Sequence, residues 1–200
     1  MSYVDMGYEE SKKIDFNIFE RVPLALGMLV RSLLIDPDTQ VNDPAINLAV
    51  NSLTRSLMEK TLQYREEKLY SHDDLVKALY ENIAYRLNVI EAFKMIGDVN
   101  AIIDALGFIF HTKPMLEEIA VLISTAEALG WIGAAPFYKE YYSKDKATGG
   151  SIGGPSFNTK LATGVLNGVV YQREMFREVR ETARKALKLI ESPTQEASTS

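Results

Sequence analysis

Apolar side chains recur every three or four residues along most of this chain, which is the spacing of one face of an α-helix. In the stretch 44–70 the apolar positions are Ile46, Val50, Leu53 and Leu57. In the stretch 71–96 they are Leu75, Leu79, Ile83, Leu87, Ile90 and Phe93. No sustained alternation of apolar and polar residues marks a strand, so the pattern predicts an all-α protein.

Residues that start or stop helices divide this pattern into segments. Asn42-Asp43-Pro44 combines capping side chains with a proline suited to a first helical turn. Ser71 and Asp74 form a second capping motif, and Gly97 can adopt the left-handed conformation that ends a helix. The helices expected from these signals span about 44–70, 71–96, 99–110, 112 to Leu129-Gly130, and 159–190. In the apolar run 16–35, Pro23 predicts either a short turn before it or a helix that begins near it.

The last expected helix has the most regular period in the chain. Its seam positions, four and three residues apart in turn, are Val165, Val169, Gln172, Phe176, Val179, Ala183, Ala186 and Ile190. This heptad spacing predicts one long amphipathic helix whose seam is buried against the bundle or against another chain. Gly164 and Gly168 share a face near its start, so a second backbone could approach closely there.

The segment 131–158 differs from the rest because it is rich in glycine, tyrosine and lysine. We expect a loop or a small hairpin there, with flexible ends at 1–15 and 191–200. The predicted fold is therefore a single-domain helical bundle over 16–190, with five to six helices and an excursion at 131–158.

Charge is distributed unevenly along the 200 residues, whose net charge is −5. Residues 1–138 hold 12 Lys/Arg and 20 Asp/Glu, a net charge of −8. Residues 139–200 hold 10 Lys/Arg and 7 Asp/Glu, a net charge of +3. Such an asymmetry marks either a binding face or a solvated helix surface of mixed charge.

The sequence excludes or disfavours several kinds of catalytic site. Without cysteine there is no thiolate ligand or nucleophile, and His72 and His111 have no partner at metal-ligand spacing. Ser151 has glycine two residues before and two after it, as in a nucleophile elbow, but it lies in a glycine–proline loop and not between a strand and a helix. We therefore expect no catalytic residue, no metal and no cofactor, and predict that the protein is not an enzyme; a site in a cavity of the bundle is the remaining alternative.

Neither a secretion signal nor a membrane span is expected. The N-terminus lacks a basic region followed by an apolar one, and Arg31 interrupts the apolar run Val22–Ile35. These features favour a soluble, cytoplasmic protein.

The leading hypothesis is a non-enzymatic helical subunit that packs into a larger protein assembly, or self-associates, through its C-terminal helix. The predicted interface residues are Val165, Val169, Gln172, Phe176, Val179, Ala183 and Ile190.

The alternative is a nucleic-acid-associated small subunit of a ribonucleoprotein complex. Helical small subunits of CRISPR effector complexes have a comparable layout, which is an analogy of fold alone. The candidate residues for nucleic-acid or anion binding are Lys139, Tyr141, Tyr142, Lys144, Lys146, Lys160, Arg173, Arg177, Arg180 and Arg184. Aromatic rings beside lysines suit single-stranded nucleic acid, whereas the acidic body argues against independent binding.

Overall fold

A computed structural model of the chain describes residues 21–34, 44–66, 72–97, 100–111, 114–134 and 157–191. Within these ranges the regular elements are seven α-helical segments and one 3-10 turn, with no strand, which confirms the all-α class. The chain divides into two compact units, Met1–Ile96 and Gly97–Ser200, and each is described by itself. That they form a single domain stays a prediction. The flexible ends predicted at 1–15 and 191–200 lie outside the described residues, except for Glu191, which is helical.

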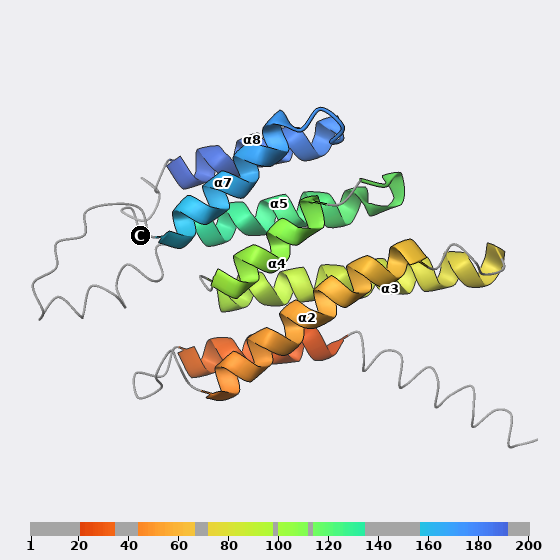
Figure 1. Cartoon of the computed structure of the whole chain (residues 1–200). Coiled ribbons are helices and arrows are strands. Elements are labelled where there is room, and N and C mark those ends of the chain that lie inside the picture. The colour runs from red at the N-terminus through yellow and green to blue at the C-terminus, as the bar shows by residue number, and fades with distance from the viewer. Residues whose placement is uncertain are drawn as a thin grey trace, which may run out of the picture. The chain divides into compact units, whose positions relative to one another are not determined.

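The first unit consists of a helix over 21–34, α2 (Pro44–Glu66) and α3 (His72–Ile96), drawn from red to yellow in Figure 1. Helix α2 begins at the predicted proline and packs against α3. Its four predicted core residues, Ile46, Val50, Leu53 and Leu57, are all buried. Helix α3 ends at Gly97, whose φ of 89° is the left-handed conformation predicted for it.

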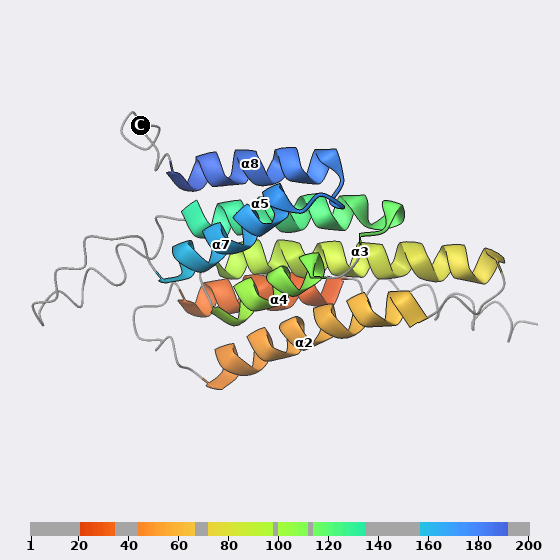
Figure 2. The same ribbon diagram turned by 45° about the horizontal axis from the view of Figure 1, so that its top comes forward.

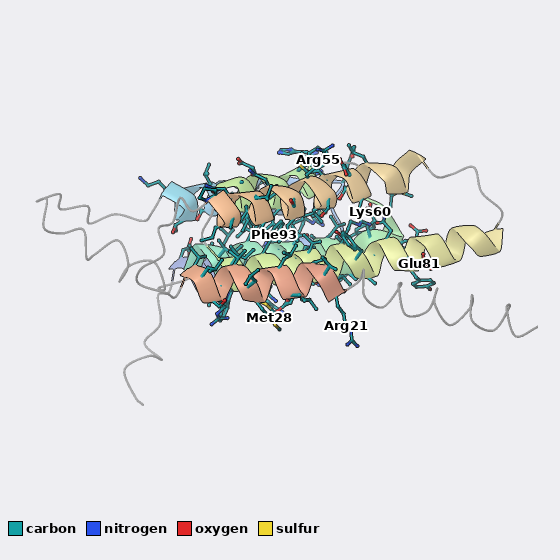
Figure 3. All side chains as sticks on the ribbon, turned by 90° about the horizontal axis from the view of Figure 1, so that it is seen from below. Arg21, Met28, Arg55, Lys60, Glu81 and Phe93 are labelled. Carbon is teal, nitrogen blue, oxygen red and sulfur yellow. The ribbon has the colours of Figure 1, made fainter. Side chains whose placement is uncertain are left out.

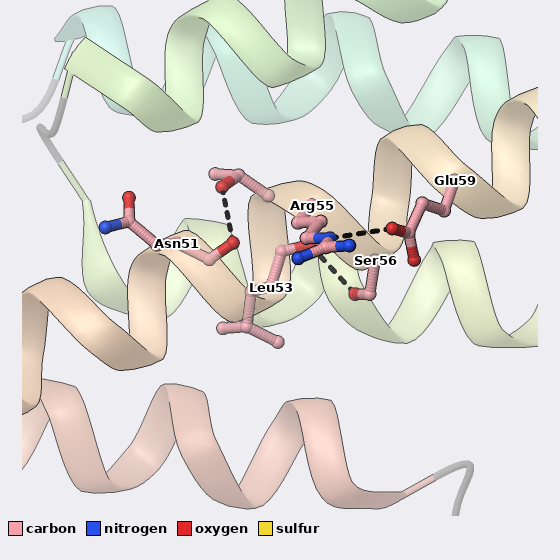
Figure 4. Close-up of polar contacts among 6 residues, drawn as sticks. Asn51, Leu53, Arg55, Ser56 and Glu59 are labelled. Carbon is pink, nitrogen blue, oxygen red and sulfur yellow. Dashed lines mark hydrogen bonds and ion pairs between the residues drawn. The ribbon is translucent and has the colours of Figure 1, made fainter.

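Polar side chains of α2 are satisfied mainly by the helix itself (Figure 4). Ser56 Oγ donates to the Leu53 carbonyl at 2.9 Å, and the Thr54 hydroxyl donates in the same way to Asn51 at 3.0 Å. On the solvent side, Arg55 Nε lies 2.7 Å from Glu59 Oε1. An exposed pair of this kind is screened by water, so it contributes little to the fold.

The helix over 21–34 approaches α3 closely at a glycine. A Cβ built on Gly27 would lie 2.8 Å from both Cα and Cβ of Ala92, a residue of α3 that is completely buried. Only a residue without a side chain therefore fits at this crossing.

The second unit contains α4 (Asn100–Phe110), the 3-10 turn η1 (Leu116–Glu118), α5 (Ile119–Ala134), α7 (Phe157–Tyr171) and α8 (Arg177–Glu191). Helix α5 is its centre, because α4, α7 and α8 all pack against it; Figure 2 shows α8 running alongside α5 with α7 across it. Gly130, predicted to end this helix, lies inside it, so that prediction is wrong.

Part of the predicted excursion at 131–158 is also helical. Residues 131–134 continue α5 and residues 157–158 begin α7, whereas 135–156 lie outside the described residues. The hydroxyl of Thr159 donates to the carbonyl of Gly133 at 3.2 Å, which ties the start of α7 to the end of α5.

The single C-terminal helix predicted over 159–190 is wrong, because the chain folds back at 172–176. The Gln172 amide donates to the Gly168 carbonyl at 3.1 Å at the end of α7, and the Arg180 amide donates to Phe176 at 3.1 Å at the start of α8. Between them the Met175 amide donates to Gln172 at 3.2 Å, and the Met175 side chain is buried. The result is a hairpin of two helices that pack on each other and on α5.

Burial explains why the hairpin replaces a straight helix. A helix of the predicted length would extend about 48 Å at about 1.5 Å per residue, roughly twice the length of α5. The half of such a helix that extends beyond α5 would leave its seam residues exposed to water. Folding back places the seam residues of both halves on α5. The apolar area removed from water outweighs the few helical hydrogen bonds lost at the turn.

The close helix approach that Gly164 and Gly168 would permit is not formed among the described residues. Both glycines are exposed, and a Cβ on either would meet nothing within 4 Å. Close approaches occur instead at two glycines of α5. A Cβ on Gly130 would lie 2.6 Å from Ala186 Cβ, and one on Gly133 would lie 2.6 Å from Ile190 Cδ1. Helix α8 therefore packs on two glycines, of which Gly130 was predicted to end the helix and Gly133 to lie in the excursion 131–158.

Replacing Gly168 by alanine is expected to raise the free energy of unfolding by about 0.5–1 kcal/mol, because alanine has the higher helix propensity and its methyl group enters open space. Urea unfolding followed by circular dichroism measures the change. The double variant Gly164→Ala/Gly168→Ala should gain about twice as much, and a loss of stability in either variant would mean that this face of α7 is occupied.

Candidate functional site

The predicted interface seam is used inside the second unit. Val169, Val179 and Ala183 are buried, and Val165, Gln172, Phe176 and Ile190 are half-buried. Val165 Cγ2 lies 3.3 Å from the position of a Cβ on Gly107 of α4, and Ile190 packs at Gly133 of α5. A partner could not reach Val179 or Ala183 without separating α8 from α5, so the seam as predicted is not a free docking surface.

The predicted basic residues fall into two groups. Lys139, Tyr141, Tyr142, Lys144 and Lys146 lie outside the described residues. The others belong to the hairpin, where Lys160, Arg173, Arg177 and Arg184 are exposed and Arg180 is half-buried. The Nε atom of Arg180 is buried and makes no hydrogen bond among the described residues. The candidates that the structure describes thus all lie on the hairpin, in α7, the turn and α8.

Helix α8 adds two exposed cations that the sequence prediction had not assigned to this surface. Lys185 and Lys188 point to solvent on the side of the helix opposite its buried Val179, Ala183 and Ala186. Arg177, Arg184 and Lys188 are spaced by seven and four residues, so they form one line along the helix. We call these three residues, with Lys185 beside them, the cationic line.

One carboxylate lies within the cationic line and is held by it. Arg177 Nε lies 2.7 Å from Glu181 Oε1. The hydrogen bond from Arg177, its charge, and the charges of Arg184 and Lys185 lower the pKa of the Glu181 carboxyl below its ordinary value. Glu181 therefore stays ionised, and its negative charge is offset by several neighbouring cations.

A second exposed surface lies on the helix over 21–34. Val22, Ala25, Met28 and Leu29 are exposed on one face, and the opposite face carries the buried Pro23, Gly27 and Val30. Met28 is 59% exposed and Leu29 is 54% exposed. Figure 3 shows Met28 pointing away from the other helices of its unit, whereas Phe93 of α3 points inward. We call Val22, Ala25, Met28 and Leu29 the apolar face.

Two exposed arginines, Arg21 and Arg31, are the charged residues of the segment 21–34 and flank the apolar face in the sequence. Exposed apolar side chains gathered on one helix face are a feature of protein interfaces.

A buried polar cluster lies between α2 and α3. Arg86 is completely buried, Asn82 lies one turn before it, and the Asn82 amide donates to the Lys60 carbonyl of α2 at 2.9 Å. Thr61 is completely buried too, and its hydroxyl donates to the Leu57 carbonyl at 2.8 Å. Arg86 keeps an interaction of its own, while its Nε and Nη2 atoms find no acceptor among the described residues.

Sequence reasoning missed this cluster because it assigned the buried side of α3 by residue type. The predicted stripe included Ile83 and Leu87, which are half-buried, whereas Asn82, Arg86 and Val89 are buried. The side chains of Leu75 and Leu79 lie outside the described part, and Ile90 and Phe93 are buried as predicted. The only available signal was that Asn82, Arg86, Val89 and Phe93 also have helical spacing, with polar residues at two of the four positions.

The described part of the chain holds neither a metal-binding cluster nor a helix that could span a membrane. No three histidine, aspartate or glutamate residues gather there closely enough to hold a metal ion, and His111 is an exposed residue just after α4. None of the described helices combines the length and apolar character that crossing a membrane requires.

Comparison with known proteins gives no relative. No protein-family model matches the chain, and no curated protein or solved structure resembles it significantly.

Proposed function

We propose that this protein is a non-enzymatic helical subunit that docks onto a partner protein through the apolar face of its 21–34 helix. The observation that carries the proposal is the exposure of Val22, Met28 and Leu29 on the side of this helix opposite its packing against Ala92. Hydrophobic side chains of this size are anchors in protein interfaces, because a partner removes their surface from water.

The charges beside the apolar face indicate which partner fits it. In a two-fold contact of this helix with a second copy, antiparallel helices would bring Arg21 opposite Arg31, and parallel helices would bring each arginine opposite itself. Within the segment 21–34 both charges are positive, so either arrangement would place like charges opposite each other. The complementary occupant is an amphipathic helix of a different protein, with acidic residues flanking its apolar stripe.

Binding of designed amphipathic helical peptides to the full chain tests the proposal. An acidic peptide with a leucine stripe flanked by glutamates should bind, and a peptide with the same stripe flanked by lysines should bind at least tenfold more weakly. The variant Met28→Glu/Leu29→Glu should lose at least tenfold in affinity for the acidic peptide, as measured by fluorescence anisotropy. Both side chains are exposed, so circular dichroism should show an unchanged helix content.

Leu48→Glu is the matched control. Leu48 of α2 is 69% exposed, and its exposed neighbours in the following turn, Asn51 and Ser52, are polar. The proposal fails if Leu48→Glu weakens binding as much as the double variant, or if the two peptides bind equally. Light scattering that shows a dimer in the wild type and a monomer in Met28→Glu/Leu29→Glu would instead make a second copy the occupant, and would overturn the proposed partner.

A further inference from the structure

The hairpin of α7 and α8 carries a charge opposite to that of the rest of the chain. Residues 157–191 hold seven Lys/Arg and four Asp/Glu, a net charge of +3, although the whole chain has a net charge of −5. Of these seven cations, six are exposed. Packing of the seam on α5 requires none of them, because the buried side of α8 consists of Val179, Ala183 and Ala186.

The cationic line has the geometry of a track for a polyanion. Arg177 and Arg184 lie about 10 Å apart along the helix axis, and Lys188 follows about 6 Å further on. Each glutamate between them is adjacent to cations, and Glu181 is bound by Arg177 itself. Along this face the helix thus presents Arg177, Glu181, Arg184 and Lys188, which are three positive charges and one negative charge.

An exposed aromatic ring lies at the turn end of this track. Tyr171, the last residue of α7, is 81% exposed, and the exposed Arg173 follows it in the turn that leads to Arg177. A tyrosine ring with both faces open to solvent can stack on a base that is not paired. Aromatic stacking platforms combined with a cationic track are the features that bind single-stranded nucleic acid.

We propose that the α7–α8 hairpin binds the backbone of single-stranded nucleic acid along the cationic line, with one base stacked on Tyr171. A duplex offers phosphates but no exposed base face for Tyr171, so the single strand fits both parts of the surface. The contacts are to phosphates and to a ring face, and binding is therefore independent of sequence. This surface is separate from the apolar face of the 21–34 helix and does not rest on the proposed function.

Fluorescence anisotropy of the full chain with a labelled oligothymidylate or oligouridylate of twenty nucleotides, titrated from 50 to 200 mM NaCl, tests the inference. The logarithm of the affinity should fall linearly with the logarithm of the salt concentration, by about 0.7 for each phosphate neutralised. The variant Arg184→Glu/Lys188→Glu should bind at least tenfold more weakly at 50 mM NaCl, and its salt slope should be shallower by about 1.4. The variant Tyr171→Ala should lose about fivefold or more without a change in slope.

Arg55→Glu is the matched control, because Arg55 and Arg177 have the same exposure of 81% and the same 2.7 Å bond to a glutamate four residues later. It changes the net charge in the same direction but lies on α2, so it should leave the affinity within twofold.

The inference is overturned if the wild type does not bind at 50 mM NaCl, or if Arg55→Glu weakens binding as much as the hairpin variants. It is also overturned if a duplex, polyglutamate or phosphatidylserine vesicles bind as tightly as the single strand. Retained binding by Met28→Glu/Leu29→Glu would separate this result from the test of the apolar face.

Discussion

Replacing Gly130 by valine is expected to lower the free energy of unfolding by about 3 kcal/mol, because there is no room for a side chain between α5 and α8. Already the first added carbon would lie 2.6 Å from Ala186 Cβ and 2.9 Å from Ala186 Cα. The second of these atoms belongs to the backbone, so α8 itself has to move. Urea unfolding followed by circular dichroism measures the loss, and hydrogen exchange should show faster opening of α8 amides.

Gly168→Val is the control for this substitution. It places the same residue in a helix of the same unit, but on an exposed face where a new Cβ meets nothing within 4 Å. Its stability should stay within about 0.5 kcal/mol of the wild type. Equal stability of the two valine variants would contradict the close packing of α8 on Gly130.

Truncation of Arg86 to alanine is expected to cost about 3–5 kcal/mol of unfolding free energy. Arg86 is the largest completely buried side chain of the described residues. Alanine therefore leaves a cavity in place of the buried stem and guanidinium. Urea unfolding of the full chain gives the magnitude, and a loss below about 1 kcal/mol would show that the site relaxes or is open to water.

Two further variants separate the causes of this loss. Arg55→Ala removes an arginine of the same helical unit that is 81% exposed, and should have no measurable effect on stability. Arg86→Met keeps most of the buried volume but removes the charge. Recovery of stability in Arg86→Met would assign the effect to packing, whereas a loss equal to that of alanine would assign it to the polar interaction of the guanidinium.

The helices themselves were predictable because their signals are local. The starting proline Pro44 and the left-handed Gly97 act within one turn of the backbone, and both delimit helices where the sequence places them. The core of α2 was predictable as well, since Ile46, Val50, Leu53 and Leu57 are the only apolar set of that helix at regular spacing around one face.

The candidate surfaces were only partly predictable. Basic residues of the hairpin could be recognised from charge alone, and Arg177 and Arg184 are indeed exposed on α8. The apolar face of the 21–34 helix could not be recognised from the sequence. That helix is apolar on most of its sides, so the pattern does not say which side the rest of the chain covers. Arg86 was missed for the opposite reason, because its charge predicts exposure to solvent and only the tertiary structure shows that it is buried.

The sequence by itself determined that this protein is built of helices, where several of them start and stop, and which residues of the last segments avoid water. Only the tertiary structure decided that the C-terminal heptads fold back at 172–176 and that Gly130, not Gly168, lies at a helix crossing. The physical reason is that a heptad period specifies a buried face but not its partner. Val169 before the turn and Val179 after it satisfy the same pattern in a straight helix and in a hairpin, and the apolar surface of α5 makes the hairpin the state that buries both.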